Sequence, residues 1–310
     1  MSYLRGFGSF LPEHRIDNQF LSERVGNDPE WILNVSGIQE RRYADEGTRV
    51  ADLAFNAAQN CLQNSGVAAE ELGLILVSSG SSELVFPGPA SEVAARLGLS
   101  ATPALDLPVA SAGALFAMSL ASQLAETYGN VLVIASEIMS RRVSLTKEAS
   151  DTAILFGDGA GACLVSKSSG FAKIIDSAIY TDGNFRESLQ LEQAGAIQMK
   201  GREVIMQATR KIPRAIGDLL ANNNVAPASV DVFLMHQANW NLIVRVAKAL
   251  EVPEQRFFCN IAKYGNTSSA SMLIAADEWW QLSQREAKGP IVFSAFGAGI
   301  NWGALLAVPA

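Results

Sequence analysis

Three polar residues, Ser111, His236 and Asn266, stand where a predicted strand or loop gives way to a predicted helix. A hydroxyl, an imidazole and a carboxamide can together deprotonate, donate to and orient a carbonyl substrate. Each alone has an ordinary explanation, as a helix cap, a hydrogen-bonded strand end and a turn residue respectively. The chain has only one other histidine, His14, so a mechanism that needs an imidazole must use one of these two. The conjunction of the three residues predicts a site that acts on a carbonyl.

The segment around Ser111 shows how a nucleophile would be positioned. A short apolar strand is predicted to end near Ala110, and a run of helix-forming residues then continues to Tyr128. At such a junction the Ser111 side chain faces the unpaired N–H groups of a helix N-terminus, which can stabilise an oxyanion.

The other two candidates follow similar boundaries in the second part of the chain. His236 comes directly after a predicted strand at residues 232–235, and Asn266 lies in the polar loop 263–271, which leads into another predicted helix. In a duplicated fold the end of the strand 232–235 is the second-half counterpart of a strand end in the first half, so His236 is expected to project into the space between the halves.

The composition excludes several classes of protein. The chain has 310 residues, 49% of them hydrophobic, which allows a large core in one domain or two fused halves. Its net charge of −7 argues against nucleic acid or an anionic membrane as the main partner. No apolar run reaches the length of a membrane span and no signal-like segment opens the chain, so we expect a cytoplasmic protein.

The three cysteines, Cys61, Cys163 and Cys259, are far apart and lack the spacing of metal ligands. Cys61 lies in a helical pattern and the other two lie in apolar, strand-like runs. All three are therefore expected to be buried small hydrophobes rather than reactive thiols, and no metal site is predicted.

The order of predicted elements repeats along the chain. Strands alternate with helices in both parts, and the strand at residues 131–135 has a counterpart at 291–295. We therefore predict an internal duplication of an α/β unit, with halves 1–166 and 167–310 and with largely parallel sheets covered by helices.

Residues 156–165 form a glycine-rich segment with the superficial look of a nucleotide-binding loop. A phosphate-binding loop should open a helix, but the run that follows is strand-like. We interpret it as a tight turn that lets two backbones approach. Among the other segments we expect a turn at 37–43 and a helix over 207–222.

Seven stretches resemble, in family order, the thiolase superfamily and, within it, the β-ketoacyl-acyl-carrier-protein synthase III type. They are Trp31 with residues 37–41, then 106–113, 156–162, 201–204, 236–239, 265–271 and 296–303. The resemblance covers nearly the whole chain. It implies a five-layered αβαβα sandwich of two similar halves, usually found as a homodimer.

The resemblance also implies catalytic roles. The family uses a Cys-His-Asn triad; His236 and Asn266 match it, and the cysteine falls on Ser111. In the family the thiolate takes an acyl group from acyl-CoA, and decarboxylation of malonyl-carrier protein yields an enolate that attacks the thioester. Because a hydroxyl has a much higher pKa than a thiol, Ser111 would need His236 as a general base in direct contact. An acyl-serine is a less electrophilic oxoester, so acylation should survive this change better than carbon–carbon bond formation.

Further roles follow from the same resemblance. Backbone N–H groups of Ser111 and of the turn Phe296, Gly297, Ala298 and Gly299 would form the oxyanion hole. The substrate-binding residues would be Trp31, Phe86, Phe156, Gly201, Arg202, Ala238 and Asn239. Trp31 would stack on the adenine of CoA, and Phe86 would lie at a dimer contact. No cofactor is implied beyond the phosphopantetheine of acyl-CoA or acyl carrier protein as substrate.

Three positions depart from the family's usual basic residues. Asn241 replaces an arginine of the carrier-protein docking surface, and Val35 and Ser150 fall where basic residues line the CoA tunnel. Arg202 or Lys147 would supply a different positive charge. The donor is therefore expected to be an unusual CoA ester or carrier-bound acyl group, or to bind weakly.

Three hypotheses remain open. The first is an acyltransferase that forms an acyl-Ser111 intermediate and passes the acyl group to a malonyl-type thioester or a heteroatom acceptor, in fatty-acid or specialised-metabolite biosynthesis. The second is an ordinary synthase III with an engineered Cys-to-Ser change. The third is a non-catalytic subunit of a condensing heterodimer, which the retention of His236 and Asn266 disfavours.

Overall fold

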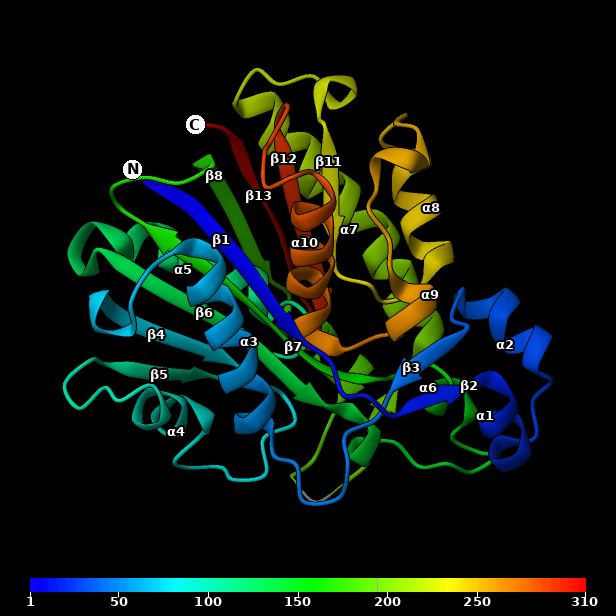
Figure 1. Ribbon diagram of the computed structural model, residues 1–310. Helices are drawn as coiled ribbons and strands as arrows, with labels where there is room; N and C mark the ends of the chain where they lie inside the picture. The colour runs from blue at the N-terminus through cyan, green and yellow to red at the C-terminus, as the bar shows by residue number, and fades with distance from the viewer. Residues whose placement is uncertain (194) are drawn as a thin grey trace.

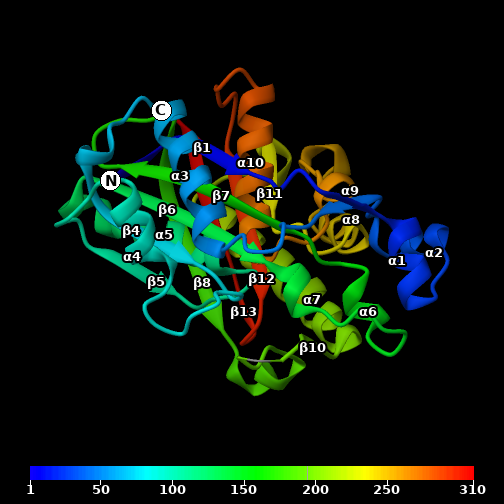
Figure 2. The same ribbon diagram turned by 60° about the horizontal axis from the view of Figure 1, so that its bottom comes forward.

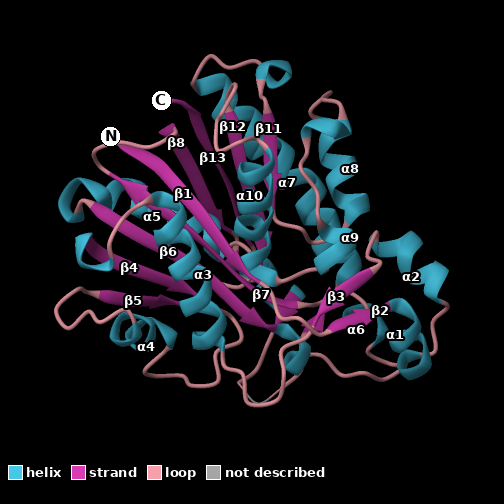
Figure 3. Ribbon diagram, in the orientation of Figure 1, coloured by secondary structure: helices cyan, strands magenta, loops and turns pink. Residues whose placement is uncertain are grey.

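In a computed structural model, which describes residues 1–193 and 195–310, nine strands form one mixed sheet (Figures 1 and 3). Across this sheet the order is β11 (Val232–Met235), β12 (Ile291–Gly297), β13 (Asn301–Pro309), β8 (Ala172–Thr181), β1 (Ser2–Phe10), β7 (Asp158–Ser166), β6 (Asn130–Ile138), β4 (Leu72–Ser78) and β5 (Ala104–Leu107). Two short pairs lie outside it, β2 (Arg15–Asp17) with β3 (Glu40–Arg42) and β9 (Leu189–Gln190) with β10 (Gln198–Met199). Figure 2 shows that β10 lies beside α7, away from the main sheet.

The strand order repeats within the sheet. The run β4-β6-β7-β1 is matched by the run β11-β12-β13-β8. Strand β1 joins the two runs, because it pairs with β7 along most of its length and with the start of β8 through Ser2, Tyr3 and Leu4. Since β13 also ends against the start of β8, the two chain termini lie close together (Figures 1 and 2).

Helices occupy three layers around the two runs of strands. The buried helices α5 (Gly113–Tyr128) and α10 (Ser271–Leu282) lie between the runs. Helices α3 (Val50–Ser65) and α4 (Pro89–Arg96) cover the outer face of the first run, and α7 (Gly201–Asn222) and α8 (Trp240–Ala249) cover that of the second. The remaining helices are α1 (Asn18–Val25), α2 (Pro29–Ser36), α6 (Ser150–Ala153) and α9 (Ile261–Tyr264). The expected five-layered αβαβα sandwich is confirmed.

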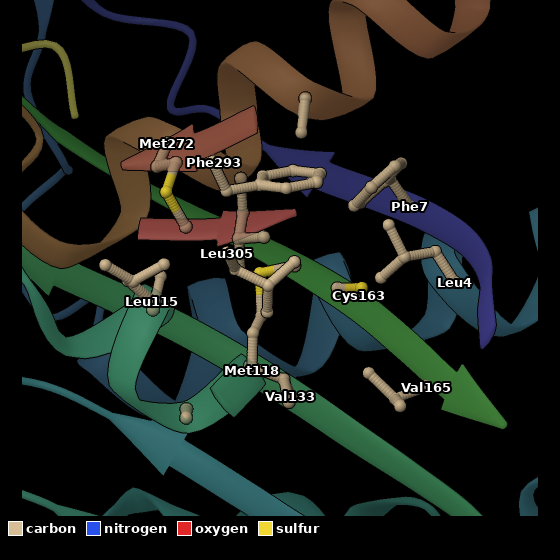
Figure 4. Close-up of a cluster of buried hydrophobic side chains, with 14 of the residues drawn as sticks. Leu4, Phe7, Leu115, Met118, Val133, Cys163, Val165, Met272, Phe293 and Leu305 are labelled. Carbon is tan, nitrogen blue, oxygen red and sulfur yellow. The ribbon is translucent and has the colours of Figure 1, made fainter. Parts of the chain in front are cut away.

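The central layer explains the composition of α5. Nine of its 16 residues are buried, mostly Ala, Gly and Ser, because the helix is covered on more than one side. Leu115 and Met118 of α5 lie with Met272 of α10 in a cluster that also takes in Phe293 and Leu305 from the second run of strands (Figure 4). This core holds the start of α5, and therefore Ser111, in a fixed position.

The expectation of largely parallel sheets is wrong. Among the described strands, parallel pairing is confined to β4 with β5 and β6, and to β11 with β12. Strand β13 follows β12 after the turn at residues 298–300, and such a short connection forms an antiparallel hairpin.

Three element boundaries also differ from the sequence expectation. Strand β5 ends at Leu107 rather than near Ala110, because Pro108 has no N–H to continue the ladder. Helix α7 begins at Gly201. The sequence pattern predicts a start at residue 207, because the first turns carry exposed apolar side chains that break the expected helical spacing. The expected turn at 37–43 contains the short strand β3.

Two of the three cysteines are buried, as expected. Cys61 and Cys163 are buried and their burial raises the pKa of both thiols, whereas Cys259 is only half-buried in a loop, with a pKa raised by burial to about 11. The expectation of a buried strand position for Cys259 is therefore wrong. In the described ranges, no helix is long and apolar enough to cross a membrane.

Candidate active site

A cavity of about 90 Å³ lies between the two halves, and Ser111, His236 and Asn266 all line it. The three side chains are buried, with exposures of 7%, 5% and 6% respectively. Its other lining residues are mostly apolar and come from widely separated segments: Leu155, Phe156, Leu189, Met199, Gly201, Val204, Ile205, Ala208, Ala238, Asn239, Leu242, Phe296 and Gly297. An apolar cavity with a few converging polar groups is the usual form of a small-molecule site.

Ser111 lies at the centre of a tight turn. The N–H of Ala112 donates to the carbonyl oxygen of Ala110 at 2.7 Å, and Ser111 has a φ of 59°. This backbone conformation is costly for a residue other than glycine and occurs preferentially at functional sites. Ser111 is not a helix cap, because α5 begins at Gly113 after Ala112 and has no side-chain cap.

The nearest polar neighbour of Ser111 is Ser268, at the start of a 3₁₀ turn (Ser268–Ala270). The N–H of Ser111 donates to Ser268 Oγ at 3.1 Å, and the two Oγ atoms are 3.5 Å apart. The N–H that we expected in an oxyanion hole therefore already has an acceptor. Among the hydrogen bonds of the described residues, none joins Ser111 to His236, so the hydrogen bond that a general base would need is not formed.

His236 is positioned by the end of β11 and by α10. Its backbone N–H donates to the carbonyl oxygen of Ser294, and its ring Nδ1 is 2.6 Å from Ser271 Oγ. Ser271 Oγ also accepts the N–H of Gln237 at 3.0 Å. Burial lowers the pKa of His236 to about 4, so the ring is neutral near pH 7.

This lowered pKa gives a first testable result. Since protonation of a buried ring begins only as the pH falls toward about 4, the His236 signals should not titrate between pH 5 and 7. An NMR pH titration of the imidazole resonances checks this, with the variant His14→Gln to assign them. A midpoint near 6.5 for His236 would contradict the neutral, buried ring described above.

Asn266 is held through its backbone and one side-chain oxygen. Its N–H donates to Leu155 O at 2.9 Å, and its Oδ1 accepts the N–H of Ser268 at 2.9 Å. Because Oδ1 is occupied in this way, the Nδ2 amide group is the part of the side chain left to donate to a ligand in the cavity.

The four residues of the expected oxyanion turn divide between two hollows. Phe296 and Gly297 line the cavity of Ser111. Ala298 and Gly299 instead line a separate, open hollow of about 700 Å³ beside β5. The structure therefore brings only the first two of the four next to Ser111.

Gly297 packs so closely on the Ser111 turn that it has no room for a side chain. A Cβ at this position would lie 2.7 Å from Ala112 N and 2.9 Å from Ser111 Cβ. The variant Gly297→Ala should displace Ser111 and slow its acylation by about 10²-fold or more, since shifts of about 1 Å can have that effect. Intact-mass kinetics measure the rate, and Gly217→Ala, which has open space around it, is the matched control.

Four of the seven expected substrate-binding residues line the cavity and three do not. Phe156, Gly201, Ala238 and Asn239 line the cavity. Trp31, Arg202 and Phe86 do not line it. All three are exposed, Trp31 by 40% and Phe86 by 84%.

Asn241, which falls at the position of an expected docking-surface arginine, makes hydrogen bonds to another helix of the protein. Its side chain donates to the carbonyl oxygens of Asn34 and Val35, and that of Asn239 also donates to Val35 O. The C-terminal end of α2 is thereby tied to the start of α8. Asn241 therefore makes hydrogen bonds within the fold while the residue remains exposed.

Sequence reasoning missed the buried carboxylate of Glu137 in β6, which is 0% exposed. Both of its oxygens accept hydrogen bonds from serine hydroxyls, at 2.6 Å from Ser81 and 2.6 Å from Ser269, and also from the N–H of Gly80. Burial raises its pKa, and these donors lower it. A glutamate inside an otherwise apolar strand was the signal in the sequence, together with the serine-rich tracts 78–82 and 268–271.

The glycine-rich segment 156–165 allows a close approach of two elements. A Cβ on Gly161 would lie 2.6 Å from Leu273 Cβ, so this segment lets β7 approach α10, as interpreted above. Within residues 1–193 and 195–310, no group of His, Cys, Asp and Glu offers three ligands for a metal ion.

Comparison with known proteins places these residues in a family. Residues 105–183 match the family described as 3-oxoacyl-[acyl-carrier-protein] synthase III, and residues 220–308 match its C-terminal region. The chain is 35% identical to β-ketoacyl-[acyl-carrier-protein] synthase III of Aquifex aeolicus, with 97% of each chain covered.

Solved structures agree with this match. The crystal structure of the synthase III from Aquifex aeolicus VF5 superposes with a TM-score of 0.94 at 34% identity, covering 99% of this chain and 100% of that one. The priming β-ketosynthase of the R1128 polyketide pathway gives 0.91 at 28% identity, covering 100% and 96%. Since both the Ser111 region and the segment with His236 and Asn266 fall inside the matched regions, the chain belongs to the β-ketoacyl-acyl-carrier-protein synthase III family of the thiolase superfamily, a family of acyltransferases.

Proposed function

We propose that this protein takes an acyl group from acyl-CoA or an acyl carrier protein onto Ser111 and passes it to a second substrate. The observation that carries this proposal is the convergence of Ser111, His236 and Asn266 on one buried cavity. Ser111 has the strained backbone typical of a presented nucleophile. The apolar walls of the cavity suit an acyl chain.

In this scheme His236 and Asn266 act on the second substrate. A neutral imidazole and the Nδ2 group of Asn266 donate to one thioester carbonyl. If that substrate is a malonyl-type thioester, the same donors stabilise the enolate left by decarboxylation. With a heteroatom acceptor the product is an ester or an amide.

A priming step of fatty-acid or specialised-metabolite biosynthesis fits this chemistry. Relatives include β-ketoacyl-acyl-carrier-protein synthases III and a polyketide priming β-ketosynthase. The oxoester at Ser111 is a weaker electrophile than the thioester that a cysteine would form, which favours a reactive acceptor.

The proposal includes a homodimer formed through β5 and the loop before α4. Strand β5 is the last strand of the sheet and pairs with β4 on one side only. Leu105 on this strand is 52% exposed. Leu84 and Val85 line one hollow with Asp106 and Leu107 of β5. These two side chains and the adjacent Phe86 are 50%, 65% and 84% exposed. Exposed apolar clusters and free strand edges are typical of association surfaces.

Intact mass spectrometry tests the acyl-transfer step. The protein is incubated with acetyl-, butyryl- and octanoyl-CoA and with the same acyl groups on a carrier protein. The expected result is one stable acyl adduct that maps to Ser111 and is absent in Ser111→Ala. No adduct with any donor, together with co-purification of a paralogue, would instead support the non-catalytic subunit.

Light scattering after size exclusion tests the dimer. The variant Phe86→Glu should weaken association, because it places a charge in the apolar cluster. Leu282→Glu, a matched change at a 71% exposed leucine at the end of α10, should not. Equal behaviour of the two variants would argue against this surface.

A further inference from the structure

Ser111 and Ser268 face each other from two strained turns. Their φ angles are 59° and 47°, both in the left-handed region that residues other than glycine seldom adopt. The Ser111 N–H donates to Ser268 Oγ at 3.1 Å, and the Oγ atoms are 3.5 Å apart. Two such residues in contact indicate that the surrounding fold maintains this arrangement at a cost.

Ser268 has the capacity to take the proton of Ser111. A hydroxyl has two acceptor sites and one donor. The N–H of Ser111 occupies one acceptor site of Ser268 Oγ, which leaves the other for the Ser111 hydroxyl. The loop is held in place by Asn266, whose Oδ1 accepts the N–H of Ser268.

Glu137 provides a base behind Ser268. Its carboxylate is fully buried and its oxygens accept from Ser81, Ser269 and Gly80. Ser269, the residue next to Ser268 in the same turn, donates its N–H to Glu137 at 3.3 Å and its hydroxyl at 2.6 Å. Ser111 is therefore hydrogen-bonded to Ser268, and the carboxylate of Glu137 is hydrogen-bonded to the turn that carries Ser268.

His236 is badly suited to deprotonate Ser111. Ser271 Oγ already accepts the N–H of Gln237, so its own hydrogen is left to donate to His236 Nδ1. In the described part of the chain no other acceptor competes for that hydrogen. The ring proton then sits on Nε2, which makes the face toward the cavity a donor rather than an acceptor.

We propose that Ser268, backed by Glu137, and not His236, takes the proton of Ser111 during acylation. The inference rests on the proposed function, in which Ser111 is acylated. As Ser111 Oγ forms a bond to the thioester carbon, its proton moves to Ser268 Oγ and the Ser268 proton moves to Glu137. When the carbon–sulfur bond breaks, the leaving thiolate takes a proton back through the same two groups. Ser268 touches the reacting oxygen, and Glu137 acts through it.

Changing the nucleophile separates this role from a structural one. We expect Ser268→Ala to slow acyl-Ser111 formation by about 10²-fold or more, the usual contribution of a general base. In the background Ser111→Cys the same change should cost much less, about threefold, because a thiol ionises with little help. Intact-mass time courses with acetyl-CoA and octanoyl-CoA measure all four proteins, and thermal unfolding reports their integrity.

Two further variants control for structural effects of the change at position 268. Thr267→Val removes the neighbouring hydroxyl, which has no partner among the described residues, and should leave the rate unchanged. Ser268→Gly removes the same hydroxyl as Ser268→Ala while tolerating the positive φ, so it keeps the test valid if the alanine variant unfolds.

The outcomes distinguish the relay from the proposed function. Equal slowing by Ser268→Ala with serine and with cysteine at position 111 would show a structural role and overturn the relay. An unchanged rate in both backgrounds would overturn it too, while acylation of Ser111 stands. No adduct on the wild-type protein, with an adduct on Ser111→Cys, would overturn the proposed function and the relay with it.

Discussion

The variant His236→Ala is expected to lose the second half-reaction, by about 10²-fold or more, while still forming the acyl-Ser111 adduct. The neutral ring donates to the second thioester and its enolate, and its loss removes one of the two donors at that oxygen. Acylation should continue, because the proposed proton acceptor for Ser111 is Ser268. Adduct formation is followed by intact mass, and product formation by chromatography with malonyl-carrier protein.

Controls for this prediction come from the same chain. His14→Ala changes the other histidine, which is exposed and donates no side-chain hydrogen bond in the described residues, and should leave both half-reactions intact. Asn266→Ala should resemble His236→Ala in the second step but should also disturb Ser268, whose N–H it holds. If His236→Ala abolishes the adduct itself, the imidazole is the base for Ser111 and the relay through Ser268 is wrong.

The variant Ser111→Cys is expected to raise carbon–carbon condensation with malonyl thioesters by on the order of 10²-fold. A thiol ionises far more readily than a hydroxyl, and the resulting thioester is a better electrophile for an enolate than the oxoester. The Ser111 turn, His236 and Asn266 remain in place around the new sulfur. Decarboxylation and product formation from acyl-CoA and malonyl-carrier protein measure the change.

Ser91→Cys, an exposed serine on α4, controls for acylation of any accessible thiol. A large gain only at position 111 would show that the serine limits condensation and that the rest of the site is competent. If Ser111→Cys gains nothing in condensation, the acceptor is better sought among alcohols and amines, and the heteroatom branch of the proposal is favoured.

The family and the five layers could be anticipated from short motifs that resemble the family, and so could the three polar residues that line the cavity. Ser111, His236 and Asn266 each follow a predicted strand or turn, and their neighbouring motifs are short enough to be recognised in one dimension. The glycines at 161 and 297 mark close backbone approaches, because only the absence of a Cβ fits there. These features depend on residue type and nearby sequence, which a linear chain displays directly.

The hydrogen-bond partners of those residues were decided by the tertiary structure alone. Glu137 and Ser268 are 131 positions apart, and nothing in either local pattern links a buried acid to the loop beside the nucleophile. Likewise Ser271, not a carboxylate, orients the His236 ring, and β5 stops at Pro108 at the edge of the sheet. Sequence patterns place a side chain on an element, but which donor meets which acceptor depends on how distant elements pack, to within a fraction of an ångström.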